Sequence, residues 1–168
     1  MTTFDFGDGP VPAHKHPNGG GWVADTATVA ESAFVADGAR VSDNARVSDN
    51  ALVYGNARVY GNARVYGDAW VYGDARVSDN ARVCGDAWVS GNARVSVTPK
   101  LLTGFAHHVT VTDNHIMVGC EMHPPSVWRE RGAAIIRKDG HSSDDARSWL
   151  AIIIAIADAH GCKDRTDE

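Results

Sequence analysis

The chain has 168 residues, enough for one domain or for a repeat module followed by a small second unit. A net charge of −5 argues against a nucleic-acid partner, because nucleic-acid binders usually carry a basic stripe. Three cysteines are too few, and odd in number, for a disulfide framework, and they suit a reducing compartment. The sequence has neither the pattern of a signal peptide nor an apolar run that could span a bilayer. We therefore expect a cytoplasmic protein without a membrane partner.

Residues 1–22 are rich in glycine and proline, and they predict an irregular cap over the first unit of the region that follows. Such a cap would cover an unpaired sheet edge that otherwise invites aggregation. His14 and His16 lie two residues apart and could bind a metal, but the stretch offers no third ligand. We favour a purely structural cap.

The region 23–98 is dominated by one six-residue pattern, V-x-x-x-A-x, which runs from Val23 to Val95 without an insertion. A short fixed period indicates a solenoid. The segment A-x-V-x alternates as a short strand does, with alanine and valine on one side. The two remaining positions are mostly Gly, Asn and Asp, which tolerate the left-handed backbone region. Each unit is therefore predicted to be a four-residue strand and a corner.

This pattern resembles the hexapeptide-repeat, left-handed parallel β-helix family, in which three hexapeptides form one triangular coil of 18 residues. The resemblance covers residues 23–96 and implies four coils with valine and alanine stacked inside. The lead-in H-x-H-P-N-G-G-G, the repeated A-R-V and the segment VTVTDNHIMVGCEMH are also similar to uncharacterised hexapeptide-repeat proteins of phages and prophages. We expect a mainly β fold, a left-handed parallel β-helix with a small C-terminal α+β unit.

A period of 18 residues sorts the outward side chains onto three faces, two of which carry arginines. The third face has no charge, and we predict that it is an apolar interface ladder, formed by Phe34, Leu52, Tyr54, Trp70, Tyr72 and Trp88. A patch of this kind is normally covered. The cover could be a second copy, as a homotrimer in view of the family resemblance. It could also be the chain's own C-terminal helix, or a sugar or foreign partner on an aromatic platform.

The two arginine faces allow two interpretations. The arginines could be solvated, or paired with corner aspartates such as Asp43, Asp49 or Asp79, and such surface pairs contribute little stability. Alternatively, they could form a groove for an anion or a nucleotide, with a neighbouring tyrosine stacking on the ligand. The candidate ladder comprises Arg40, Arg58, Tyr60, Arg64, Tyr66 and Arg76.

The segment 99–162 predicts a different structure. Pro99 ends the repeat because it cannot donate a ladder hydrogen bond. Two alternating runs around Asp113 and Asn114 predict a β-hairpin, which could extend or cap the last coil. A first helix is expected from about Pro125 to a stop at Asp139-Gly140.

A second helix follows, capped by Ser142 or Ser143 and ended by Gly161. It is apolar over most of its circumference, so we expect it to be buried. Residues 163–168 are predicted to be a frayed tail.

The same segment contains the pairs Cys120-x2-His123 and His160-x-Cys162, an inventory that would suit zinc. Nothing in the sequence brings the two pairs together, so we predict neither metal nor cofactor. Cys120 and His123 could also act as nucleophile and base, but no orienting carboxylate is evident. We favour a half-buried structural His123 beside Trp128.

The coils lack the residues that catalysis on this fold requires. Acyltransferases of the resembled family place a catalytic histidine on or beside the coils, and no histidine occurs between Trp22 and Phe105. The histidines of the fold's carbonic anhydrases and the threonine ladders of ice-binding β-helices are missing too. We therefore expect a non-catalytic, oligomeric binding protein.

The phage resemblance implies an inhibitor of host defence that acts in the host cytoplasm, by binding a host protein or by sequestering a small anionic ligand. One alternative is an acyltransferase with its histidine outside the coils, at His107, His108 or His123. Another is a phage structural or assembly protein built on a rigid rod.

Overall fold

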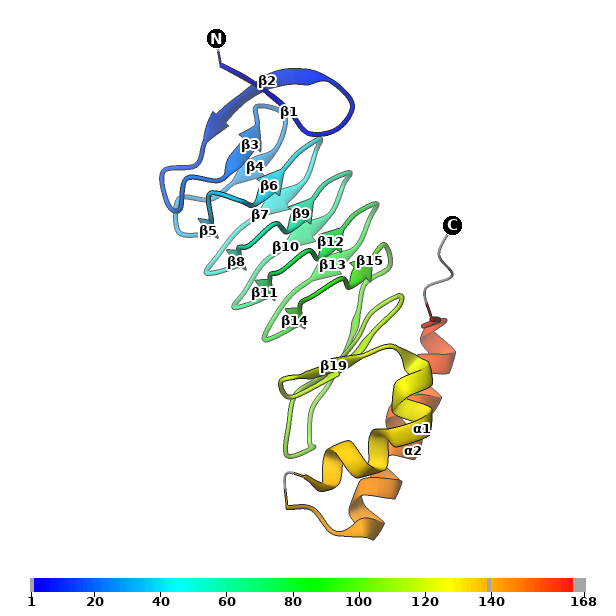
Figure 1. Ribbon diagram of the computed structural model, residues 1–168. Helices are drawn as coiled ribbons and strands as arrows, with labels where there is room; N and C mark the ends of the chain where they lie inside the picture. Colours follow the sequence, from blue (N-terminus) through cyan, green and yellow to red (C-terminus); the bar gives the residue numbers. More distant parts are fainter. Residues whose placement is uncertain (1, 139, 165–168) are drawn as a thin grey trace. The chain divides into compact units, whose positions relative to one another are not determined.

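A computed structural model describes residues 2–138 and 140–164 of the chain (Figure 1). The chain divides into two compact units, with the boundary between Thr98 and Pro99. The first unit contains the repeats, and the second contains a small antiparallel sheet and two helices (Figure 1).

The lead-in is more regular than the sequence predicts. Strands β1 (Thr3–Asp5) and β2 (Pro10–Lys15) form an antiparallel hairpin, and β2 pairs with β3 (Trp22–Ala24), the first strand of the solenoid. The expected irregular cap is therefore wrong, because the alternation in P-V-P-A-H-K gives a strand that fills the sheet edge.

The glycine-rich segment that follows lies directly on the first coil. The Gly21 N–H donates to the Val35 carbonyl over 2.8 Å, and the buried His16 ring lies 3.1 Å from the Ala33 carbonyl oxygen. A Cβ on Gly19 or Gly21 would lie 2.4 Å from an atom of Val35, so only glycine permits this approach.

In the described part of the chain, twelve two-residue strands continue the solenoid after β3 (Figure 1). They are β4 (Thr28–Val29), β5 (Phe34–Val35), β6 (Arg40–Val41), β7 (Arg46–Val47), β8 (Leu52–Val53), β9 (Arg58–Val59), β10 (Arg64–Val65), β11 (Trp70–Val71), β12 (Arg76–Val77), β13 (Arg82–Val83), β14 (Trp88–Val89) and β15 (Arg94–Val95). The regular ladder bonds nevertheless include the flanking residues, since the Ser42 N–H donates to the Val59 carbonyl over 2.9 Å.

These strands form three sheets, in which each strand pairs in parallel with the strand 18 residues further on. One sheet has the order β1-β2-β3-β6-β9-β12-β15, and the others have the orders β4-β7-β10-β13 and β5-β8-β11-β14. The predicted fold class is confirmed: the chain is a β-solenoid of about four coils with parallel sheets, followed by a small α+β unit.

Valine and alanine fill the solenoid interior. From Ala33 to Val95, the valines and alanines at the two fixed positions of the V-x-x-x-A-x pattern are at most 1 % exposed. Burial of a valine side chain stabilises a fold by roughly 1.5–3 kcal/mol, so the stacked valines supply a large part of the driving force.

The corners explain why glycine and aspartate alternate at one repeat position. Asp43 and Gly61 stand one coil apart, and both have a positive φ, of 58° and 70°. The Asp43 carboxylate accepts a hydrogen bond of 2.8 Å from the Gly61 N–H. A Cβ on Gly61 would lie 2.9 Å from the backbone nitrogen of Asp79 in the next coil. The corners are therefore tight, and their polar groups bond from coil to coil.

The second unit contains a four-stranded antiparallel meander and two helices. The strands, in spatial order, are β16 (Lys100–Leu102), β17 (Val109–Val111), β18 (Ile116–Val118) and β19 (Glu121–His123). The predicted hairpin is its central pair, with Val111 opposite Ile116. The helices are α1 (Pro125–Arg137) and α2 (Ser143–His160).

A single aromatic side chain joins the sheet to α1. Trp128 is fully buried, and its indole N–H donates to the Ile116 carbonyl over 2.7 Å. The core around it includes Val109, Ile136 and Ile153. Helix α2 packs on this core through Ile153 and Ala157, and Ile152 on another side of the helix is 49 % exposed.

The helix ends follow their sequence signals. Ser142 caps α2 by accepting a hydrogen bond from the Asp145 N–H, and Gly161 ends it with φ 82°. Helix α1 ends at Arg137, and the Asp139 of its predicted stop lies outside the described residues.

The first two residues of the predicted frayed tail are held by hydrogen bonds. The Lys163 N–H donates to the Asp113 carbonyl over 2.9 Å, and the Asp164 carboxylate accepts from the Ser126 N–H over 3.0 Å. The remaining tail, residues 165–168, lies outside the described residues. Among the described helices, none combines the length and the apolarity that a membrane span requires.

Candidate functional site

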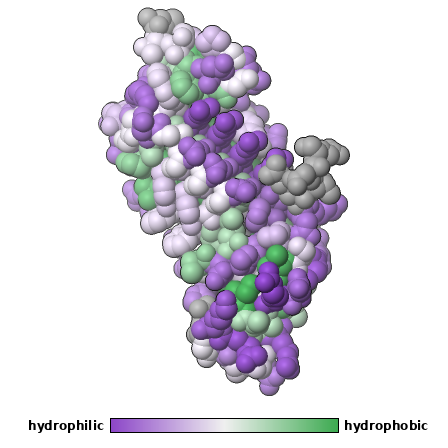
Figure 2. Space-filling view, in the orientation of Figure 1, coloured by the Kyte–Doolittle hydropathy of each residue, from purple (hydrophilic) through white to green (hydrophobic). Residues whose placement is uncertain are grey.

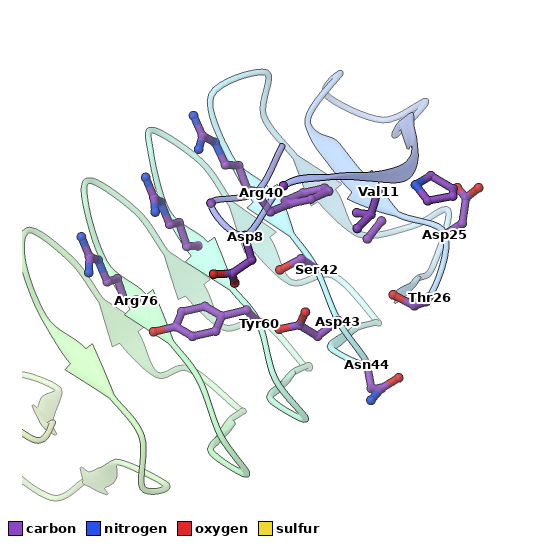
Figure 3. Close-up of a pocket in the computed structure, with 16 residues that line it drawn as sticks. Asp8, Val11, Asp25, Thr26, Arg40, Ser42, Asp43, Asn44, Tyr60 and Arg76 are labelled. Carbon is purple, nitrogen blue, oxygen red and sulfur yellow. The ribbon is translucent and has the colours of Figure 1, made fainter. Parts of the chain in front are cut away.

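A groove of about 730 Å³ lies on the seven-stranded sheet (Figure 3). Outward side chains of β6, β9 and β12 form its floor, and the loop between β1 and β2 overhangs it. We call it the arginine groove, and its floor includes Arg40, Ser42, Arg58, Tyr60 and Arg76. Its volume lies within the range of small-molecule sites.

Strand register sets the spacing of these side chains. Arg40 is paired with Arg58, and Arg58 with Arg76, in adjacent parallel strands. Neighbouring arginines therefore start about 4.8 Å apart. Ser42 and Tyr60 form a second column, about 7 Å along the strands from the first. Figure 2 shows the resulting hydrophilic band over β6, β9, β12 and β15.

The arginine column concentrates positive charge. Two unit charges 4.8 Å apart repel by about 1 kcal/mol in bulk water and by about 3–4 kcal/mol at the effective dielectric of a protein surface. Among the described residues, no ion pair includes Arg40, Arg58 or Arg76. The Arg40 guanidinium does lie over the Phe4 ring, 5.2 Å from its centre. The column therefore places three positive charges along one side of the groove.

The corner aspartates proposed as arginine partners have other hydrogen bonds. Asp43 and Asp49 accept from the N–H groups of Gly61 and Gly67 in the next coil. Asp79 accepts from the Ser78 hydroxyl over 2.9 Å. Pairing with these aspartates therefore does not account for the arginines of the described chain.

The opposite end of the groove carries carboxylates. Figure 3 shows Asp25 and Asp43 on the side away from the arginines, and Asp8 pointing down from the overhanging loop. Asp25 lies 2.9 Å from the His14 ring nitrogen Nδ1. The groove therefore has a basic side and an acidic side.

Two of the predicted ladder residues lie on another sheet. Arg64 and Tyr66 belong to the β4-β7-β10-β13 face, where they line a smaller cavity of about 290 Å³ together with Arg46 and Arg82. A hydrogen bond with Cys84 raises the pKa of Tyr66 above its usual value. The predicted ladder therefore divides into four residues in the arginine groove and two outside it.

The predicted apolar ladder follows the third sheet. Phe34, Leu52, Trp70 and Trp88 are in register, one in each coil, and all are half-buried. The rings of Trp70 and Trp88 stack with centres 5.2 Å apart and planes at 14°.

The tyrosines of this face stack in the same way. The Tyr54 and Tyr72 rings are 5.1 Å apart with planes at 5°, and burial raises the pKa of Tyr54. Because the faces of these rings stack on each other, their edges point outward. Edges suit packing against another layer of side chains better than stacking on a sugar.

The histidines and cysteines considered as metal ligands have different surroundings. His14 contacts Asp25, whereas His16 is buried against the Ala33 carbonyl. Within residues 2–138 and 140–164, no group of three or more His, Cys, Asp or Glu side chains is arranged to hold a metal ion. Burial raises the pKa of the Cys162 thiol to about 12, so the free thiol is protonated at neutral pH.

His123 is half-buried beside Trp128, as the sequence predicts. Its ring contacts Trp128 at 5.7 Å, edge to face, and its Nε2 lies 3.0 Å from a Glu121 carboxylate oxygen. Glu121 is a carboxylate partner that sequence reasoning missed, although alternation along β19 could have suggested it. Cys120 is exposed.

Sequence reasoning also missed the loop that overhangs the arginine groove. Asp5 shapes this loop, since its carboxylate accepts hydrogen bonds from the N–H groups of Gly7 and Gly9, over 2.8 and 3.1 Å. The stretch D-F-G-D-G was the available signal, because an aspartate followed by glycines favours such a turn.

A known repeat family matches the solenoid. The model of the YdcK β-solenoid repeat matches residues 39–55, 45–58, 57–73 and 75–91. No curated protein and no solved structure matches the chain. The repeat match and the three parallel sheets define a β-solenoid repeat protein.

Proposed function

We propose that the protein is a non-catalytic binding protein whose arginine groove holds a small anionic ligand. The observation that carries this proposal is the arginine column itself. Arg40, Arg58 and Arg76 stand in register along a groove, and the ion pairs of the described chain include none of them. A bound anion would relieve their mutual repulsion and accept hydrogen bonds from several guanidinium groups.

Calorimetric titration with pyrophosphate tests this site. We expect the Arg58→Gln variant to bind pyrophosphate at least tenfold more weakly, because a hydrogen bond to a charged group contributes about 1.5–3 kcal/mol. Arg64→Gln is the matched control, because Arg64 has the same place on the other arginine face. Equal effects of the two variants would argue against a site in the groove.

The same proposal includes self-association through the apolar ladder. The ladder offers roughly 250 Å² on a flat estimate, and its burial would contribute on the order of 6 kcal/mol as an upper bound. The outward ring edges of Trp70 and Tyr54 suit a second copy, and the resemblance to hexapeptide-repeat proteins favours a homotrimer.

Sedimentation equilibrium of the Trp70→Glu variant tests self-association. We expect a lower mass than for the parent protein, whereas Arg64→Glu places the same charge on another face and should leave the mass unchanged. An unchanged mass for Trp70→Glu would show that the apolar ladder does not make an oligomer.

The biological role in this proposal follows from the phage resemblance. A phage-encoded protein of this kind would act in the host cytoplasm as an inhibitor of host defence, either by sequestering an anionic signal in the groove or by binding a host protein. Mass spectrometry of small molecules released from protein purified out of host cells tests this role. Copurification of a phosphorylated metabolite with the parent protein, but not with Arg58→Gln, is the expected result.

A further inference from the structure

The two sides of the arginine groove differ in the groups that they offer a ligand. Arg40, Arg58 and Arg76 offer only hydrogen-bond donors and positive charge. Asp25 and Asp43 offer only acceptors when ionised. A ligand that is purely anionic would satisfy the first side and would be repelled by the second. The full groove therefore fits a molecule with an anion at one end and donors at the other.

The distance between the two sides limits the size of that molecule. Arg40 lies in β6 and Asp43 lies at the corner three residues later, so their Cα atoms are at most about 10 Å apart. An inorganic phosphate is too small to contact both sides, whereas a sugar that carries a ring at one end and a phosphate at the other can span them.

The middle of the groove is apolar and aromatic. Tyr60 lies on the floor between the arginine column and Asp43, and Val11 approaches from the overhanging hairpin (Figure 3). Phe6 also lines the groove. Val11 is 41 % exposed, so its apolar side chain is accessible to a ligand in the groove. A flat ring could cover Tyr60 by stacking, which contributes about 1–3 kcal/mol for a nucleic-acid base.

We infer that the arginine groove binds a nucleoside phosphate, with the phosphate on the arginine column and the base near Tyr60 and Asp43. This inference rests on the proposed anion-binding function. Carboxylates accept hydrogen bonds, and guanine has two adjacent N–H donors on its Watson–Crick edge. The groove therefore favours guanosine phosphates over uridine phosphates.

Asp43 makes this inference open to a conservative test. Its φ of 58° lies in the left-handed region, which asparagine tolerates as well as aspartate does. An asparagine oxygen can also keep the hydrogen bond from the Gly61 N–H. Asp43→Asn therefore changes the charge that faces the ligand and leaves the corner intact.

Tyr60 offers a second matched change. Serine stands in the same column one coil before and one coil after it, at Ser42 and Ser78. Tyr60→Ser therefore gives a sequence that the solenoid already accommodates. Tyr66→Ser is the control on the other arginine face.

The experiment is calorimetric titration with GMP, UMP, guanosine and inorganic phosphate. GMP should bind at least tenfold more tightly than guanosine or phosphate, and more tightly than UMP. Asp43→Asn and Tyr60→Ser should weaken GMP binding at least fivefold without weakening phosphate binding, and Tyr66→Ser should change neither.

Two results would overturn the nucleoside inference. The first would leave the proposed anion-binding function standing, and the second would overturn that function too. If phosphate binds as tightly as GMP, and if Asp43→Asn and Tyr60→Ser have no effect, the groove is a simple anion site and the proposed function stands. If GMP, UMP, phosphate and pyrophosphate all fail to bind, the nucleoside inference and the proposed anion site fail together.

Discussion

The solenoid and the C-terminal unit bury their side chains in different ways. In the solenoid, every coil buries the same small set of valines and alanines, so each coil repeats the contacts of its neighbour. The C-terminal unit instead depends on single large side chains such as Trp128, Ile116 and Ile153. Stability is therefore distributed along the solenoid and concentrated in the C-terminal core, which leads us to expect different responses to mutation, acid and charge.

The largest expected effect is the loss of Trp128. Trp128→Ala removes a fully buried ring and its hydrogen bond to Ile116, which should destabilise the C-terminal unit by about 3–5 kcal/mol. Circular dichroism at 222 nm reports on this unit, because both described helices belong to it. We expect that signal to melt early while the amides of the solenoid strands keep their protection from hydrogen exchange.

Trp88→Ala is the matched control, because Trp88 is half-buried on the outside of a coil. It should have a smaller effect on thermal unfolding. If the solenoid amides lost protection together with the helices in Trp128→Ala, the two regions would unfold as one, and the comparison between them would fail.

A corner glycine should give the next largest effect. Gly67 has φ 74°, and an added Cβ would lie 2.9 Å from the Gly85 nitrogen of the next coil. Gly67→Ala therefore combines left-handed backbone strain of roughly 1–2 kcal/mol with a contact that only a backbone shift can relieve.

Gly85→Ala isolates the backbone strain from the steric contact. Gly85 has φ 61°, but nothing lies within 4 Å of its added Cβ, so only the strain applies. Hydrogen exchange of the β10 and β13 amides should show a larger loss of protection for Gly67→Ala. Equal losses of protection would mean that the coils separate at little energetic cost, so that the close packing between coils does not limit the substitution.

The two regions also differ in how far the sequence predicts them. The repeat of valine and alanine predicts the coils, the 18-residue register and the three faces, because each residue meets its own copy in the next coil. It does not predict the overhanging loop of the groove, which depends on where the N-terminal hairpin folds back. In the C-terminal unit, the central hairpin and the two caps of α2, Ser142 and Gly161, follow local signals.

Strands β16 and β19 escaped prediction because they lie at the sheet edges, where fewer side chains are fully buried than in β17 and β18. The partner of His123 escaped it as well, because Glu121 becomes a neighbour only once β19 is extended. The 18-residue period does separate Arg64 and Tyr66 from Arg58 and Tyr60, and these two pairs belong to different sheets.

Acid should act on the C-terminal unit more than on the solenoid. Burial lowers the pKa of His115. The charge of Asp164 opposes this decrease, and His123 adds to it. Burial also lowers the pKa of His160, which Asp113 opposes and Lys100 reinforces. Both histidines are therefore protonated more readily in the unfolded chain.

The sign of the pH effect follows from this difference. Above pH 6.5, the usual histidine pKa, neither state is protonated and stability is constant. Below it the unfolded chain takes up protons first, so stability falls with pH until the folded pKa values are reached. We expect the 222 nm melting temperature to fall between pH 7.5 and 5.5, and His160→Gln to reduce that fall. A fall of equal size in the solenoid strands would contradict the assignment to these histidines.

The smallest expected effect is that of replacing an arginine by glutamine. The substitution should stabilise the solenoid and destabilise the C-terminal unit. Arg64 lies between Arg46 and Arg82 in register, so Arg64→Gln removes repulsion from two like charges. In the C-terminal unit, Arg129 forms an ion pair with Asp158, so Arg129→Gln removes an attraction. Both pairs of groups are largely exposed, and each effect should amount to a few tenths of a kcal/mol.

Thermal unfolding at low salt should therefore show a slightly higher melting temperature for Arg64→Gln and a slightly lower one for Arg129→Gln. Both shifts should shrink at 1 M salt, where the screening length falls to about 3 Å. A destabilised Arg64→Gln would mean that the apolar stem of Arg64 stabilises the coil by more than the ladder's repulsion costs. The opposite signs, if observed, would show that the arginine ladder of this sheet lowers the stability of the solenoid, whereas the ion pair raises that of the C-terminal unit.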